Sequence, residues 1–221
     1  LCLCAIILFL LSKIKDLYSQ INELSLDPLK LAEGQHFSAG PVDAVLLGDS
    51  HAANWPLRRI GELECINLGA GGQTTAQIRL RAEFQLAGQP KLLVIIAGAN
   101  DARCALTARK DLDEIAHAAC QQIKKIIEKH ENSRIIVFTI PPVFKMPFKY
   151  YLFDRKRFSE AIAAINSKIR KLDYPHVTLF DANRILKNAQ GILTTDGIHL
   201  SKKGYAVLES HLRTLLISEK R

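Results

Sequence analysis

The chain has 221 residues, of which 48% are hydrophobic and 24% are charged. This composition is typical of a packed globular protein and excludes a disordered or a collagen-like chain. The 30 Lys and Arg residues against 22 Asp and Glu residues give a net charge of +8, but no block of five or more basic residues occurs. Charge alone therefore does not indicate nucleic-acid binding, and we predict no nucleic-acid partner.

The chain opens with an apolar segment, residues 1–11. As a helix this segment would span about 16 Å, which is shorter than the roughly 30 Å hydrocarbon core of a bilayer. Three interpretations fit it: the end of a membrane anchor, the apolar part of a signal peptide, or a buried helix. We favour an anchor or an uncleaved signal, because the segment is apolar on all sides and no small-residue cleavage site follows it.

Residues 12–40 are more polar and predict a short helix followed by a linker. This change in composition divides the chain into a signal-like or membrane-anchoring segment with its linker, residues 1–40, and a domain over residues 41–221.

Short aliphatic runs alternate with amphipathic segments in the larger domain. The runs predict strands that are buried on both faces, at residues 42–47, 65–68, 92–97, 134–140 and 177–180. The segments with helical periodicity predict helices at residues 74–87, 111–130, 155–172 and 201–218. This alternation predicts a parallel sheet covered by helices on both faces, with its functional groups at the carboxyl ends of the strands.

Polar or glycine-rich residues follow the first two strands. Gly48-Asp49-Ser50-His51 would form a turn that exposes the Ser50 hydroxyl at the sheet edge, although Asp and Ser are also common helix N-caps. The glycine-rich residues 69–75 follow the second strand, where they allow a ligand to approach closely and can present an N–H group to an anion. This loop lacks the Gly-Lys-Ser/Thr of a Walker loop and the spacing of a dinucleotide-binding loop.

Two further polar groups follow later strands. Asn100, after the third strand, can donate a side-chain N–H group to a developing oxyanion, although Asn also favours turns. Asp196 and His199 share one loop, in which the carboxylate can hold one ring nitrogen while the other faces a nucleophile. Ser201 is a candidate N-cap of the last helix. A doubly wound sheet would bring all of these segments to one edge.

The four motifs together resemble those of the SGNH (GDSL-type) hydrolases. They are Gly-Asp-Ser at residues 48–50, the glycine block at 69–75, Gly-x-Asn-Asp at 98–101 and Asp-x-x-His at 196–199. The resemblance covers about residues 42–218. It implies an α/β fold, a flavodoxin-like three-layer α/β/α sandwich with a parallel sheet of about five strands.

The resemblance also implies roles for individual residues. A catalytic triad is implied, with Ser50 as the nucleophile and Asp196 and His199 as its partners. An oxyanion hole is implied, formed by the backbone N–H groups of Ser50 and Gly72 and by the side chain of Asn100.

His51 departs from the apolar residue that many members carry at this position, and in this respect the chain is similar to members that act on acetylated carbohydrates. Residues 143–158 mix aromatic and basic side chains. They would form either a lid or substrate wall, or an apolar layer packed under the next helix. We assign four candidate substrate-binding residues: Asp49, His51, Phe144 and Phe148.

The resulting prediction is a serine esterase that acts on a carboxylic ester, an acyl ester of a small molecule or an O-acetyl group on a glycan. An O-acyltransferase acting on a cell-envelope glycan and a non-catalytic envelope binding protein are the alternatives. A metal-dependent phosphoesterase is disfavoured, because the closely spaced early Asp-x-His ligands of such sites are missing.

No cofactor or metal is predicted, since the five cysteines give no zinc-binding pattern. The sequence leaves open whether Cys104 and Cys120 pair. With membrane association through residues 1–11, the catalytic domain is expected to be exported or membrane-anchored, on the periplasmic side.

Overall fold

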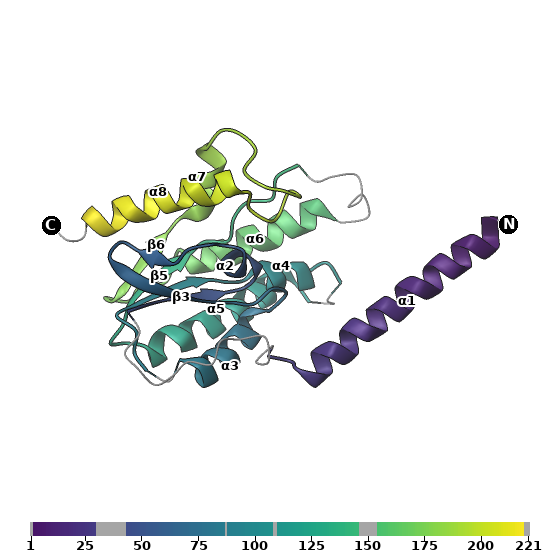
Figure 1. The fold of residues 1–221 in the computed structure, drawn as a ribbon, viewed down its shortest axis with the longest axis horizontal. Coiled ribbons are helices and arrows are strands. Elements are labelled where there is room, and N and C mark those ends of the chain that lie inside the picture. Colours follow the sequence, from purple (N-terminus) through teal and green to yellow (C-terminus); the bar gives the residue numbers. More distant parts are fainter. Residues whose placement is uncertain (1, 30–42, 87, 108–109, 146–153, 219–221) are drawn as a thin grey trace. The chain divides into compact units, whose positions relative to one another are not determined.

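The structure is a computed structural model that describes residues 2–29, 43–86, 88–107, 110–145 and 154–218 (Figure 1). The chain divides into two compact units, Leu1–Gly34 and Gln35–Arg221.

The first unit contains one long helix, α1 (Cys2–Leu26). The apolar segment and the short helix expected after it are therefore a single element. The helix ends two residues before Pro28, as the steric demands of proline on the preceding residue favour. Among the described residues, no helix combines enough length with enough apolar character to cross a membrane.

A six-stranded sheet forms the centre of the second unit, in the order β2-β3-β1-β4-β5-β6. Its strands are β1 (Ala44–Gly48), β2 (Arg59–Ile60), β3 (Leu63–Gly69), β4 (Leu92–Ile96), β5 (Arg134–Phe138) and β6 (Val177–Phe180). All neighbouring strands are parallel except the pair β2 and β3. The five predicted strands are present, and the α/β prediction is confirmed. The sixth, β2, has two residues and is too short to give a sequence pattern.

Helices cover both faces of the sheet, which makes the predicted three-layer sandwich (Figure 1). Four helices correspond to the predicted ones: α3 (Thr75–Gln85), α5 (Leu112–Lys129), α6 (Arg155–Ile169) and α8 (Lys202–Ser218). Buried side chains of α3, α5 and α6 pack on one face and those of α7 (Ala182–Asn188) and α8 on the other. The Ser201 hydroxyl accepts a hydrogen bond from the N–H group of Gly204, which confirms Ser201 as the N-cap of α8.

Three short helices are not among those predicted from periodicity: α2 (Ser50–Ala53), α4 (Ala99–Cys104) and α7, although the helix N-cap considered for Asp49 or Ser50 corresponds to the start of α2. Each begins within three residues of a strand end and spans at most two turns, so it shows no amphipathic period. Two of them, α2 and α4, lie at the polar motifs and shape the site.

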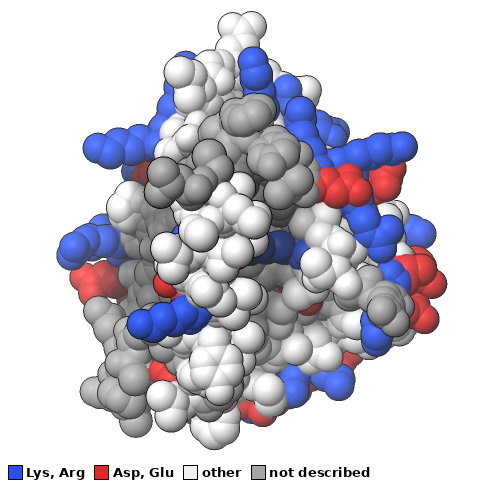
Figure 2. Space-filling model, turned by 90° about the vertical axis from the view of Figure 1, so that its right-hand side faces the viewer, with Lys and Arg blue, Asp and Glu red and all other residues white. Residues whose placement is uncertain are grey.

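Charged side chains do not gather into one basic patch on the face shown in Figure 2, where Lys and Arg lie among Asp and Glu. Ion pairs also occur within the hydrolase unit: Lys168 lies 2.7 Å from Asp113, and Arg213 lies 2.6 Å from Glu209. On the face in Figure 2 the basic side chains are thus interspersed with acidic ones.

Candidate active site

The turn after β1 places Ser50 at the edge of the sheet. Asp49 is completely buried and caps α2, because its side chain accepts a hydrogen bond of 2.9 Å from the N–H group of His51. Its second oxygen accepts from the N–H group of Ala99 at 3.3 Å. Burial raises the pKa of Asp49 to about 6, although these hydrogen bonds and nearby His199 oppose the shift. The Asp49 carboxylate thus joins the turn after β1 to the turn after β4.

Two positions at this edge require glycine, because the backbone of a neighbouring element occupies the space that a Cβ atom would need. A Cβ atom on Gly48 would lie 2.0 Å from the carbonyl oxygen of Ile96, and one on Gly69 would lie 2.1 Å from the backbone nitrogen of Ala53. Neither position tolerates a side chain, because β4 lies against the end of β1 at Gly48 and α2 lies against the end of β3 at Gly69.

The glycine-rich loop after β3 passes beside Ser50. A Cβ atom on Gly71 would lie 3.9 Å from the Cβ of Ser50. Gly72 has φ +80°, in the left-handed region that favours glycine. The Asn100 side-chain amide donates to the carbonyl oxygen of Gln73 at 3.0 Å. The predicted oxyanion-hole residues Ser50, Gly72 and Asn100 therefore come from adjoining turns.

Asp101 also fixes this loop. Its two carboxylate oxygens accept hydrogen bonds from the backbone N–H group and the hydroxyl of Thr75, at 2.9 and 2.7 Å. Thr75 is the first residue of α3, so Asp101 tethers the start of that helix to α4. Burial raises the pKa of Asp101, against the effect of these hydrogen bonds.

Arg81, which the sequence did not indicate as a site residue, is buried and holds the same loop through hydrogen bonds. It is only 2% exposed, and it donates to the side chain of Gln73 at 2.8 Å and to the carbonyl oxygen of Gly48 at 3.2 Å. A third bond of 2.8 Å reaches the Gln85 side chain. Burial lowers the pKa of Arg81 to about 10, so the guanidinium stays charged at neutral pH. Basic residues are common on exposed helix faces, and nothing in the sequence distinguishes Arg81 from these.

The last loop brings a carboxylate and an imidazole into contact. Asp196 Oδ2 lies 2.8 Å from His199 Nδ1, and Asp196 Oδ1 accepts from the N–H groups of Ile198 and His199 at 2.9 and 2.8 Å. Burial alone would raise the pKa of Asp196, but the hydrogen bonds from His199 and Ile198 outweigh it and lower the pKa to about 2. Asp196 is therefore ionised at neutral pH and holds one nitrogen of the ring.

A ring contact places this loop beside the Ser50 turn, and a hydrogen bond joins the following helix, α8, to the same turn. The ring of His199 lies 6.1 Å, centroid to centroid, from the ring of His51, the residue after Ser50. The Tyr205 hydroxyl of α8 donates to the carbonyl oxygen of His51 at 2.9 Å. A direct hydrogen bond between Ser50 and His199 is not among the contacts of the described residues. The four sequence motifs thus meet at one edge of the sheet.

The segment after β5 supports the Asp196–His199 loop, because the Phe144 N–H group donates to the carbonyl oxygen of Gly197 at 2.8 Å. Phe144 also packs against the core on the α8 face of the sheet. Of the other predicted substrate-binding residues, Asp49 and His51 are buried, and Phe148 lies outside the described residues.

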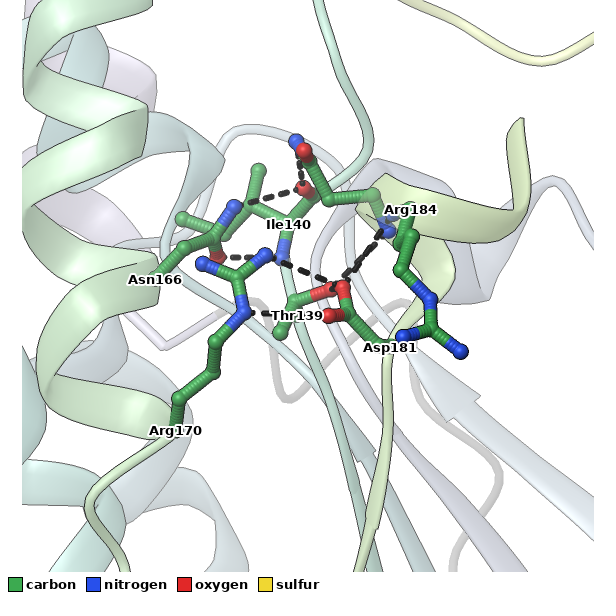
Figure 3. A network of polar contacts seen from close by, with 7 residues as sticks. Thr139, Ile140, Asn166, Arg170, Asp181 and Arg184 are labelled. Carbon is green, nitrogen blue, oxygen red and sulfur yellow. Dashed lines mark hydrogen bonds and ion pairs between the residues drawn. The ribbon is translucent and has the colours of Figure 1, made fainter. Parts of the chain in front are cut away.

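A polar network fixes this segment where it leaves β5 (Figure 3). The Asn166 side chain accepts from the N–H group of Ile140 at 2.7 Å and donates to its carbonyl oxygen at 3.0 Å. Asp181 accepts from the Thr139 hydroxyl at 2.9 Å and from two nitrogens of Arg170 at 3.0 Å each. The backbone leading to Phe144 is thereby held from two helices.

A family model for GDSL-like lipases and acylhydrolases matches residues 36–207. The chain belongs to the GDSL-like lipase/acylhydrolase family. The family resemblance seen in the sequence is confirmed, and with it the prediction of a carboxylic ester hydrolase.

Two curated proteins are related to this GDSL-type hydrolase. An N-acylneuraminate cytidylyltransferase from Escherichia coli is 27% identical over 213 residues, which cover 91% of the chain and 45% of that protein. The chain thus spans less than half of this relative. The uncharacterized lipoprotein YqeF from Bacillus subtilis is 25% identical, over 76% of the chain and 87% of the lipoprotein.

Solved structures share the fold. A putative platelet activating factor from Streptococcus pneumonia has a TM-score of 0.67 and 20% identity, covering 96% of this chain and 99% of its own. A carbohydrate acetylesterase from Sinorhizobium meliloti has a TM-score of 0.63 and 18% identity, covering 80% and 99%.

A cavity of about 210 Å³ in this hydrolase lies beside the network around Asn166, and the predicted triad residues do not line it. In the described part of the chain, no three or more His, Cys, Asp and Glu residues cluster as a metal site would require. Cys104 and Cys120, whose pairing the sequence leaves open, are free thiols.

His51 makes the stability of the hydrolase sensitive to acid. Burial, followed by the nearby charge of His199, lowers the pKa of His51 from 6.5 to about 4. Its Nδ1 atom has no hydrogen-bond partner within the described residues. Between these two pH values the unfolded chain binds a proton that the folded chain does not, so the free energy of unfolding falls as the pH falls.

We expect His51→Leu to remove this acid sensitivity. The wild type should lose on the order of 3 kcal/mol more unfolding free energy than the variant between pH 6.5 and pH 4. Urea unfolding at a series of pH values measures the difference. The exposed His117 provides the control, and His117→Gln should follow the wild-type curve. Parallel curves for His51→Leu and wild type would contradict the assignment.

Proposed function

We propose that this hydrolase cleaves its ester through a Ser50-His199-Asp196 triad. The contact between Asp196 and His199 beside the Ser50 turn supports this triad most directly. A serine hydroxyl becomes a good nucleophile only when a base accepts its proton. With Nδ1 held by Asp196, the Nε2 atom of His199 is the base, and the partial exposure of His199 leaves it accessible.

In the proposed reaction, Ser50 Oγ attacks the carbonyl carbon of the ester while its proton passes to His199. The tetrahedral intermediate then collapses, the alcohol leaves with that proton, and an acyl-serine remains. Water attacks the acyl-serine with His199 again as base, which releases the carboxylic acid and restores Ser50.

The intermediate carries a negative oxygen that needs hydrogen-bond donors. We assign the backbone N–H groups of Ser50 and Gly72 and the side-chain amide of Asn100 to this role. Asn100 has two amide hydrogens, of which the bond to Gln73 uses one. Asp49, Asp101 and Arg81 hold the three turns, so the donors are fixed in place before the reaction, as electrostatic stabilisation requires.

We propose a short acyl group, an acetyl group on a carbohydrate, as the substrate. Two observations support this choice: the Gly-Asp-Ser-His motif and a carbohydrate acetylesterase among the structures of the same fold. A curated relative named for N-acylneuraminate supports a sugar as the acyl carrier. The His199 side chain is 39% exposed, so water can reach it, as hydrolysis requires.

We also propose that residues 1–11 attach the chain to a membrane and that the hydrolase unit lies outside the cytoplasm. The apolar sequence and the lipoprotein relative support this location. Cell fractionation of the full chain tests it, and recovery with the cytoplasmic proteins would contradict it.

An ester panel tests the substrate class. The full chain is assayed with p-nitrophenyl acetate, butyrate and octanoate and with an O-acetylated xylan, with and without EDTA. We expect kcat/KM to be highest for the acetyl ester, acetate release from the xylan, and no effect of EDTA. Preference for the octanoate would contradict the short acyl group. Inhibition by EDTA would favour the metal-dependent alternative instead.

A further inference from the structure

The long helix α1 carries a seven-residue repeat. Leucine recurs at Leu3, Leu10 and Leu17, and isoleucine recurs at Ile7, Ile14 and Ile21. Written as heptads abcdefg, isoleucine occupies every a position and leucine every d position over residues 3–21. All six side chains are exposed in the single chain, by 47% to 70%. We call these six residues the α1 seam.

The residues around the seam differ between the two halves of the helix. Between residues 12 and 22 the b, c and f positions are all polar: Ser12, Lys15, Asp16, Ser19 and Asn22. The apolar stripe in this half is therefore narrow, as in a coiled coil, and not the broad face of a helix that packs on a globular core. The first half, residues 3–11, is apolar at every position and continues the same seam.

We propose that two copies of this chain associate through the α1 seam as a parallel two-stranded coiled coil. The combination of isoleucine at a and leucine at d favours two parallel strands over three or four. The helix is about 37 Å long. Burying the seam and its flanking side chains in both copies would remove roughly 1,000 Å² from water, about what a specific interface needs.

The charges of α1, all of which lie after residue 11, favour a second copy over a flat lipid surface as the occupant of the seam in this half of the helix, beyond the segment proposed to attach to the membrane. A helix that lies flat on a membrane has a polar face rich in Lys and Arg. In contrast, α1 carries two lysines, Lys13 and Lys15, against two acidic residues, Asp16 and Glu23. Lys13 is in addition paired with Asp16, at 3.4 Å. In a parallel pair both chains leave the coil at the same end, and each continues into its own hydrolase unit.

Mass measurement of the full chain in a non-ionic detergent tests the proposal. Sedimentation equilibrium should give twice the chain mass of 24.7 kDa. Ile14→Lys combined with Leu17→Lys places charges in the seam and should weaken association at least about a hundredfold. The control, Ser12→Lys combined with Ser19→Lys, adds the same charge on the outer face and should stay dimeric. Ester hydrolysis per chain should be unchanged in both, which shows that the hydrolase unit is folded.

A wild-type chain that stays monomeric at micromolar concentrations would overturn the proposal. A seam variant that dimerises as well as the wild type would also overturn it. Orientation is tested with Ile14→Cys in a chain whose Cys2, Cys4 and exposed Cys104 are replaced by Ser. Equivalent a positions face each other only in a parallel coil, so mild oxidation should give a reducible dimer. Its absence from an otherwise dimeric sample would overturn the parallel arrangement.

Discussion

Hydrolysis of p-nitrophenyl acetate should fall by roughly 10³ to 10⁶ in kcat when Ser50 is replaced by Ala, because the variant lacks the atom that forms the acyl-enzyme. Ser50 starts α2 and is partly exposed, so the loss of its hydroxyl leaves the buried Asp49 cap intact. The thermal unfolding temperature should therefore change little while activity is lost. Steady-state kinetics and a melting curve on the same preparation measure both.

A double variant distinguishes a catalytic triad from residues that contribute to kcat independently of one another. His199→Ala should cost about as much activity as Ser50→Ala, and the double variant should be within a few-fold of either single variant, because the two residues act as one unit. Ser210→Ala, on the exposed side of α8, is the control and should keep full activity. Additive losses in the double variant would contradict the assignment of His199 as the base for Ser50.

Asp196→Asn should lower kcat by roughly 10³ to 10⁴ at neutral pH. Two backbone N–H groups, of Ile198 and His199, require an acceptor at the position of Oδ1. The oxygen of the introduced amide must take that position, so its NH₂ group faces His199 Nδ1. The ring is then forced to carry its proton on Nε2, the atom that has to accept the proton of Ser50.

The measurement is again kcat with an acetyl ester, combined with NMR of the His199 ring to identify the protonated nitrogen. Asp173→Asn, an exposed residue between α6 and β6, is the matched control and should behave as wild type. Activity of Asp196→Asn within tenfold of wild type would show that the Asp196–His199 contact is structural and not part of the reaction.

The arrangement of the main elements could be predicted because their patterns are long. The strands β1, β4 and β5 are runs of buried residues, mostly aliphatic, and α5 shows a clear apolar face, so these elements were visible without any contact information. The strands β3 and β6 are present as predicted, but most of their residues are only partly buried, in contrast to the predicted burial on both faces. The meeting of Ser50, Gly72, Asn100 and the Asp196–His199 loop followed from parallel topology, since the carboxyl ends of the strands share one edge.

Other features could not be predicted, because they depend on contacts between distant residues. Arg81 has the appearance of a surface residue on α3 until the structure shows it buried beneath Gln73 and Gly48. The bond from Tyr205 to His51 joins residues 154 positions apart, and no spacing rule indicates it. The sequence allows Asp49 to be either a substrate-binding residue or a helix N-cap, and the structure shows a buried N-cap.

Covalent labelling of the full chain tests directly whether Ser50 is the nucleophile. A fluorophosphonate reagent phosphonylates an activated serine: the oxygen forms a bond to phosphorus, fluoride leaves, and the serine proton passes to the base. Peptide mass spectrometry should find one adduct per chain, on Ser50, which is absent in Ser50→Ala and forms much more slowly in His199→Ala. A folded wild-type chain that remains unlabelled, or an adduct on a different serine, would show that Ser50 is not the nucleophile.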